Sequence, residues 1–197
     1  MSAVSETIVR EYFELHEFLV RQHRKYIAQT KREDDDIDFF VFNPHPLTAS
    51  APLPFILSSA DLMQVERAIV VVKGWHTETF SSARLASTPE IFRFVGTKVL
   101  QQAARVFGEN GAPLKILVVP TLPQETQARD ASIALLRAKG VDAVIPFRTM
   151  LADLVTHTEA NRNYQKSDLL QTIRILKNYD FFKEPQMELF KTRRKKR

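Results

Sequence analysis

The sequence predicts an α/β protein in which a central mixed β-sheet is flanked by helices on both faces. Residues 68–72 are five consecutive apolar residues, which is typical of a strand buried on both faces. Residues 114–145 read as strand, helix and strand with short connections, which favours parallel pairing through a right-handed crossover. The aromatic and β-branched run at 37–43 predicts a further strand, which Pro44 ends.

The amino-terminal part is expected to supply a helix and antiparallel strands. The helix is predicted over residues 5–17, with Ser5 as its N-cap. Its apolar positions recur at helical spacing, at Ile8, Tyr12 and Leu15. Residues 18–26 are interpreted as a strand, with a continued helix as the open alternative. The segment 45–54 is expected to be a loop, because together with Pro44 it carries four of the ten prolines.

The carboxyl-terminal part alternates helices and strands after the buried run. Thr88, Pro89 and Glu90 predict the start of a second helix, as N-cap, first-position proline and first-turn acid, with an end near Gly108. The remaining predicted elements are a strand at 114–119, a helix at 125–139 capped by Gly140, a strand at 141–145, and helices at 147–157 and 167–180.

Length and composition predict one cytoplasmic domain. The 197 residues are enough for one sizeable core, so we expect a single domain over residues 1–190 and a basic tail at 191–197. The chain has no cysteine, which excludes disulfides, thiolate metal sites and thiol nucleophiles and fits a reducing compartment. The longest apolar run is five residues, so neither a membrane span nor a membrane partner is expected.

The net charge of +5 is concentrated in the tail. Its sequence KTRRKKR holds six of the 28 basic residues, which leaves 22 against 23 acidic residues in the remainder, a net charge of −1. Such an arm often binds phosphate backbones, and a passive solubilising terminus is the equally weighted alternative. The candidate nucleic-acid contacts are Arg21, Arg24 and Lys25 in the cluster RQHRKY, and Arg193, Arg194, Lys195 and Lys196 in the tail.

Several classes of enzyme are excluded by motif. The five glycines, at 74, 96, 108, 111 and 140, permit no dinucleotide-binding glycine motif, no Walker loop and no nucleophile elbow. The segment His76-Thr77-Glu78 matches part of the zinc deaminase motif, but the cysteines that complete that metal site are absent.

An acid and a lysine on neighbouring strands predict phosphodiester chemistry. Cleavage of a phosphodiester needs a divalent cation held by carboxylate oxygens, and a nearby cationic side chain to stabilise the charge that builds on phosphorus. Asp38 lies on one predicted strand, Lys73 ends the buried strand, and Glu11 lies on the preceding helix. If the two strands are adjacent, Asp38 and Lys73 can point into the same crevice.

The segments VREYFELHEFLVRQHRKY, DIDFFVFNP, AIVVVKGWH and LLRAKGVDAVIPF resemble the PD-(D/E)XK nuclease superfamily, which has a restriction-endonuclease-like fold. The resemblance spans roughly residues 5–157. It implies a Mg²⁺-dependent endonuclease that acts on DNA, with Asp38 and Glu11 as metal ligands and Lys73 assisting catalysis. It also allows a homodimer.

The sequence departs from this family at Val71. The family places an acid two residues before the lysine, on the same side of the strand, and valine cannot bind a cation. A replacement acid is expected among Glu11, Glu14 and Glu78. Three residues also have a purely structural alternative. Asp38 can be an acid next to a turn, Glu11 an exposed helical acid, and Trp75 a packing residue rather than a base-stacking one.

Three functions therefore stay open at this point. The first is a metal-dependent nuclease. The second is a catalytically inactive nuclease-fold module that binds nucleic acid or protein, and Val71 favours it. The third is a structural subunit whose basic tail docks onto nucleic acid or a ribonucleoprotein.

Overall fold

The structure confirms the α/β class. It is a computed structural model that describes residues 3–23, 37–48, 52–108 and 111–182. The chain divides into two compact units, Met1–Leu154 and Val155–Arg197. The single domain expected over residues 1–190 stays a prediction.

The first unit is built on one five-stranded mixed sheet with the strand order β1-β2-β3-β4-β5. Its strands are β1 (Leu19–Gln22), β2 (Phe39–Phe42), β3 (Arg67–Val72), β4 (Leu114–Val119) and β5 (Ala143–Pro146). The pairs β1·β2 and β2·β3 are antiparallel, whereas β3·β4 and β4·β5 are parallel. Strand β2 therefore runs opposite to the other four, as the predicted mixed sheet requires.

Two strand predictions need adjustment. β1 occupies only part of the expected 18–26, of which residues 24–26 lie outside the described part of the chain. β5 begins two residues later than the expected 141–145, because Val141 N donates to Leu136 O at 3.1 Å and so still belongs to the cap of the preceding helix. Gly140 has φ +88° there, as its predicted left-handed cap position demands.

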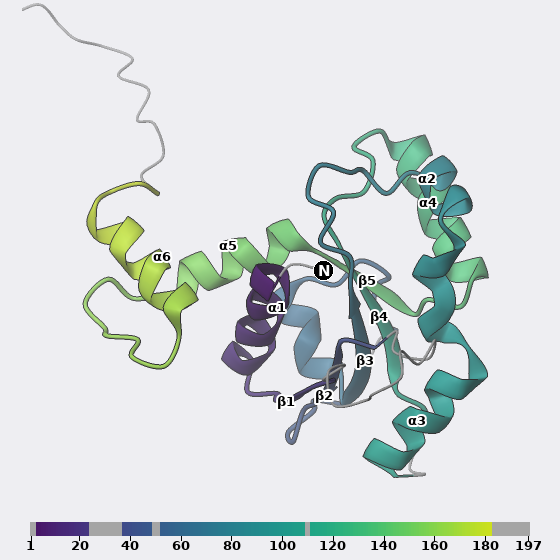
Figure 1. The fold of residues 1–197 in the computed structure, drawn as a ribbon, viewed down its shortest axis with the longest axis horizontal. Helices are drawn as coiled ribbons and strands as arrows, with labels where there is room; N and C mark the ends of the chain where they lie inside the picture. Colours follow the sequence, from purple (N-terminus) through teal and green to yellow (C-terminus); the bar gives the residue numbers. More distant parts are fainter. Residues whose placement is uncertain (1–2, 24–36, 49–51, 109–110, 183–197) are drawn as a thin grey trace, which may run out of the picture. The chain divides into compact units, whose positions relative to one another are not determined.

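Helices cover both faces of the sheet. Figure 1 shows α1 on one side and α2, α3 and α4 on the other. The α-helices of the described residues are α1 (Ala3–Leu15), α2 (Ser82–Ser87), α3 (Thr97–Phe107), α4 (Thr126–Ala138), α5 (Phe147–His157) and α6 (Asp168–Asn178), and the two 3₁₀ helices are η2 (Ser59–Gln64) and η3 (Pro89–Val95). None of these helices has the length and apolar character needed to cross a membrane.

Two helix predictions were wrong in detail. Ser5 does not cap the first helix but lies inside α1, where it is buried. The helix expected from Thr88 to Gly108 is broken at Gly96 into η3 and α3. Residues 91, 92 and 94 of η3 are buried, and Gly96 itself is extended, with φ −69° and ψ 159°, so the helical hydrogen bonding stops there and begins again with α3. Pro89 begins η3 as predicted, but the Thr88 hydroxyl donates to Arg84 O instead of capping.

The sheet separates two halves of the core. Residues 68–72 of β3 are each at most 1% exposed, which confirms that this strand is buried on both faces. On one face α1 contributes Ile8, Val9, Tyr12 and Phe13. On the opposite face Ile69 and Val71 belong to a cluster that includes residues of α2, η3, α3 and α4. This burial holds β2, β3 and β4 in one register.

The second unit contains α6 and the loop before it. Ser167 is the N-cap of α6 and accepts a hydrogen bond from Leu170 N, in agreement with the predicted start. Lys177 Nζ donates to Thr158 O at 2.7 Å, which ties α6 to that loop. Tyr179 and Phe181 are strongly exposed at the end of α6.

Candidate functional site

Two of the predicted site residues, Asp38 and Lys73, lie where the carboxyl end of β3 is next to the amino end of β2. These strands are antiparallel neighbours, with Phe39 paired to Val70. Asp38 directly precedes β2 and Lys73 directly follows β3. The predicted adjacency of the two strands is therefore confirmed, and we refer to this end of the sheet as the β2–β3 rim.

Asp38 is built into the rim as a hydrogen-bond acceptor. It is 4% exposed, and its Oδ2 accepts a hydrogen bond from Val72 N at 2.7 Å. Its own backbone N donates to Val70 O at 3.1 Å, and its O accepts from His23 N at 2.8 Å. The carboxylate thus replaces a backbone acceptor at the point where the β2–β3 ladder ends, so that a buried N–H is satisfied.

Lys73 continues the pairing of β3 with β4. Its backbone N donates to Val118 O at 2.9 Å. The neighbouring Gly74 faces α1, since a Cβ there would lie 2.5 Å from Ser5 Oγ, whereas Trp75 packs against the core on the opposite face. Because side chains alternate along extended chain, Lys73 belongs to the same face as Val71 and Trp75.

Val71 occupies the position of the missing acid. It is 1% exposed and lies in the apolar cluster on the face covered by α2, α3 and α4. Its surroundings are closed by other apolar side chains, so β3 supplies a methyl-lined surface where a second metal-binding carboxylate is expected. An apolar residue at position 71, where the PD-(D/E)XK family has an acid, therefore fits the apolar packing around it.

The acids of α1 interact with each other and with a neighbouring arginine. Glu11 is 7% exposed, and its Oε1 accepts from Arg10 Nη2 at 3.2 Å. Glu11 is therefore a buried acid, and the structural alternative of an exposed helical acid is wrong. Partial burial and then repulsion by Glu11 raise the pKa of Glu14, against the smaller opposing effect of Arg10.

The predicted metal ligands Asp38 and Glu11 are not joined by a third one in the described part of the chain. Among the residues that the structure describes, no group of three or more His, Asp or Glu side chains is arranged to hold a metal ion. Mg²⁺ can be bound through one or two carboxylates with water and substrate phosphate. A two-carboxylate site formed by Asp38 and Glu11 therefore stays a prediction.

The other acid proposed as a replacement has a different partner. Glu78 Oε2 lies 3.3 Å from Arg84 Nε, and the Arg84 guanidinium lies over the Trp75 ring, 5.3 Å from its centroid. Trp75 also packs against Phe80, with ring centroids 5.6 Å apart. This position of Trp75 supports the packing alternative rather than base stacking.

His76 is directed toward α1 instead of toward Glu78. Its Nε2 lies 3.0 Å from the hydroxyl of Ser5, and its ring contacts Phe147 edge to face at 4.6 Å. The pair His76 and Glu78 is therefore split between two sets of contacts. A metal site at this loop gains no support.

Of the predicted nucleic-acid contacts, Arg21 is the one that the structure describes. It is exposed on β1, opposite Phe40 of β2. Its guanidinium forms no hydrogen bond or ion pair with any other described residue. Arg24, Lys25, Arg193, Arg194, Lys195 and Lys196 lie outside the described residues.

A pocket that the sequence did not predict is lined in part by Arg21. It has a volume of about 340 Å³, and we call it the aromatic pocket. Its lining residues are Leu19, Val20, Arg21, Phe40, Phe42, Val106 and Phe107. The alternation of Leu19 and Arg21 on β1, and of Phe40 and Phe42 on β2, is a signal for one shared face, but the contribution of α3 is invisible in the sequence.

The chain has no detectable similarity to known proteins in sequence or in structure. No family model, no curated protein and no solved structure matches the chain. The fold and the rim define an α/β protein whose five-stranded mixed sheet is packed against helices.

Proposed function

We propose that the protein is a nuclease-like DNA-binding module of the restriction-endonuclease-like fold whose phosphodiester-hydrolysing site is incomplete. The order of elements supports this fold: a helix, three antiparallel strands, helices, a fourth strand, a helix and a fifth strand, with the last two strands parallel to the third. That order is the one expected from the resemblance to the PD-(D/E)XK nuclease superfamily.

The juxtaposition at the β2–β3 rim carries the proposal. Asp38 is hydrogen-bonded to the amide of Val72, one residue before Lys73, so an acid and a cation occupy adjacent strand ends. Val71 is enclosed by apolar side chains in place of the second acid. One of the two central carboxylates that would hold Mg²⁺ is thereby missing, whereas the lysine can still contact a phosphate.

Hydrolysis is the second candidate function. The juxtaposition of Asp38 and Lys73 at adjacent strand ends favours it, whereas the position of Glu11 on α1 does not, because Lys73 belongs to the opposite face of the sheet. In that case Asp38 and Glu11 hold Mg²⁺, which polarises the phosphate and supplies an activated water. Lys73 stabilises the negative charge of the transition state.

The test measures binding and cleavage on the same preparation. Binding of a fluorescent DNA duplex is followed by anisotropy at several salt concentrations, and cleavage is followed on supercoiled plasmid with Mg²⁺ or Mn²⁺. The variants are Lys73→Ala, Asp38→Asn and, as a matched control, Lys139→Ala, which removes a lysine from the end of α4. We expect salt-dependent binding that Lys73→Ala weakens and Lys139→Ala leaves unchanged, with no nicking above background.

Two results would contradict the proposal in different ways. Nicking by the wild type that both Asp38→Asn and Lys73→Ala abolish would establish the second candidate. Absence of DNA binding at low salt would remove the nucleic-acid function altogether.

A further inference from the structure

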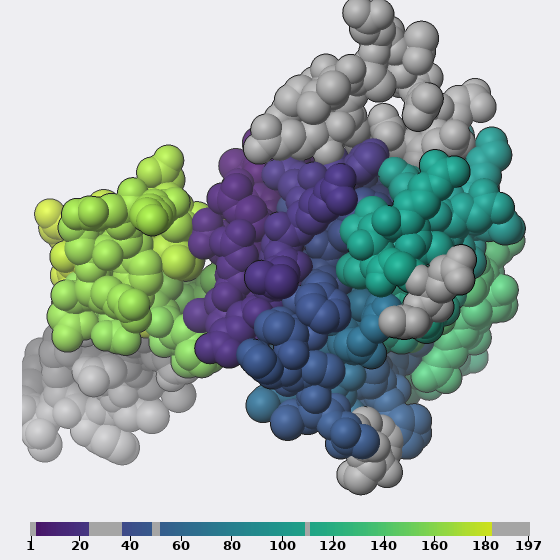
Figure 2. All heavy atoms as spheres, turned by 90° about the horizontal axis from the view of Figure 1, so that it is seen from below, coloured from purple at the N-terminus to yellow at the C-terminus, as the bar shows by residue number. Residues whose placement is uncertain are grey.

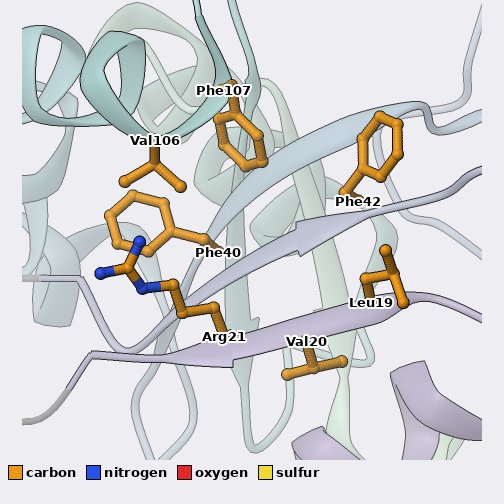
Figure 3. Close-up of a pocket in the computed structure, with 7 residues that line it drawn as sticks. All are labelled: Leu19, Val20, Arg21, Phe40, Phe42, Val106 and Phe107. Carbon is orange, nitrogen blue, oxygen red and sulfur yellow. The ribbon is translucent and has the colours of Figure 1, made fainter.

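The aromatic pocket lies beside the β2–β3 rim, on the face of the β1–β2 ribbon that is directed toward α3. Figure 3 shows Leu19, Arg21, Phe40 and Phe42 projecting from the ribbon toward Val106 and Phe107 of α3, whereas Val20 points to the other side. Figure 2, seen from below, shows the purple and indigo residues of the amino-terminal part next to the teal residues of the α3 region. Strand register and helix packing together form this hollow.

The walls of the pocket offer aromatic rings to a ligand. Phe40 is buried, and Phe107 meets it edge to face with ring centroids 5.8 Å apart. Phe42 and Phe107 are half-buried, and Leu19 at the rim is 64% exposed. The pocket is thus apolar and open at one side. Such a pocket suits a flat ring better than a flexible apolar ligand, which needs a fully enclosed cavity.

Arg21 is the charged residue among the described residues that line the pocket. Among the seven lining residues it is the only one whose side chain carries a polar atom. Its guanidinium has no hydrogen-bonding or ionic partner among the described residues, so it is available to an anion. An exposed guanidinium beside aromatic rings fits a ligand that joins a planar ring to a phosphate.

The pocket connects to the rim through β1 and β2. Arg21 is paired with Phe40, and His23, two residues further along, donates its backbone N–H to Asp38 O. The His23 ring also contacts Phe40, with centroids 6.1 Å apart. A nucleic-acid backbone that passes Lys73 and Asp38 at the rim can therefore reach Arg21 along the same edge.

We infer that the aromatic pocket holds one unstacked base of a single-stranded nucleic acid, with the adjoining phosphate on Arg21. The inference rests on the nucleic-acid binding proposed above and adds a preference for single strands over duplex. Bases stack on aromatic side chains irrespective of their identity, and apart from Arg21, which is assigned to the phosphate, the lining side chains carry no hydrogen-bonding group for a base edge. Binding is therefore expected to depend little on base sequence.

The experiment compares single and double strands on matched variants. Fluorescein-labelled oligothymidylate, a duplex of equal length, and an abasic strand of equal length are titrated by anisotropy. Phe42→Leu keeps apolar volume but removes a ring, and Phe42→Tyr keeps the ring. Arg21→Gln removes the charge, and Arg21→Lys keeps it.

We expect the wild type to prefer oligothymidylate to the duplex and to the abasic strand. Phe42→Leu should weaken oligothymidylate binding about 5- to 150-fold, the range for loss of one base–aromatic stack, and leave duplex binding unchanged. Phe42→Tyr should bind like the wild type. Arg21→Gln should reduce the salt slope for the single strand by about 0.7, whereas Arg21→Lys should not.

The failures of the two proposals are distinguishable. Tight duplex binding together with equal affinity for the abasic strand, or with no effect of Phe42→Leu, would overturn the base-binding inference and leave the proposed DNA-binding function standing. Absence of binding to every probe would overturn both. A free nucleotide carries the same ring and anion, so displacement of oligothymidylate by equimolar thymidine monophosphate would reassign the pocket to nucleotides and overturn the single-strand inference.

Discussion

Replacing Asp38 with alanine should destabilise the protein by removing one buried hydrogen bond. The carboxylate accepts from Val72 N at 2.7 Å, and Val72 is fully buried, so no water can replace the missing acceptor. An unsatisfied buried donor costs about 1–3 kcal/mol. Asp38→Asn keeps an oxygen acceptor in nearly the same place, so it should be less destabilising than Asp38→Ala.

The expected destabilisation is measurable in the unfolding midpoint. For a chain of this size, 1 kcal/mol lowers Tm by roughly 2–4 °C, so Asp38→Ala should lower Tm by roughly 2–12 °C. Urea unfolding can be followed through Trp75, the single tryptophan, whose ring packs on Phe80. Asp130→Ala, at an exposed position of α4, is the control and should stay within about 0.5 kcal/mol of the wild type.

Two outcomes of the Asp38 experiment would refute the reasoning. If Asp38→Ala unfolds at the same urea concentration as the wild type and Asp130→Ala, with an unchanged slope, then Asp38 does not satisfy the Val72 amide. Equal destabilisation by Asp38→Ala and Asp38→Asn would show that charge, and not the presence of an acceptor oxygen, is what the rim requires.

Three further predictions concern packing, pH and salt. Gly74→Ala should lower the free energy of unfolding by about 1–3 kcal/mol, because its Cβ would lie 2.5 Å from Ser5 Oγ, whereas Gly96→Ala, whose Cβ would lie 3.2 Å from a carbonyl oxygen, should have a smaller effect in the same urea assay. Burial raises the pKa of Tyr12 to about 12, above its ordinary value of 10.0, so the folded state holds the proton more tightly and stability should fall as the pH rises from 10 to 12. Over that interval the free energy of unfolding should fall by about 2–3 kcal/mol more for the wild type than for Tyr12→Phe, and equal decreases would contradict the assignment. Removal of residues 191–197 should reduce the salt slope of duplex binding by about 0.9 for each phosphate that the tail neutralises, and an unchanged slope would identify the tail as a passive terminus.

Local sequence patterns were sufficient for the elements whose apolar residues are continuous or strictly periodic. The strand at 114–119 and the helix at 147–157 have the predicted bounds, and the helix predicted at 125–139 differs by one residue at each end. The strand buries four consecutive apolar residues and each of the two helices presents a single apolar stripe, so their form is decided by their own residues. The break at Gly96 was not predictable in this way, because it depends on where the surrounding helices receive the buried residues of η3.

Short-range patterns in the chain were enough to establish the α/β class and the buried central strand, and to place an acid before one strand and a lysine after another. Each of these follows from the local periodicity of apolar residues, whereas the pairing that makes the two strand ends neighbours came from the folded sheet. The folded molecule was needed to learn that Asp38 satisfies the Val72 amide, that Val71 is enclosed by apolar side chains, and that Phe107 meets Phe40 beside Arg21. These interactions join residues far apart in the chain, and their positions are set by packing, which no local pattern encodes.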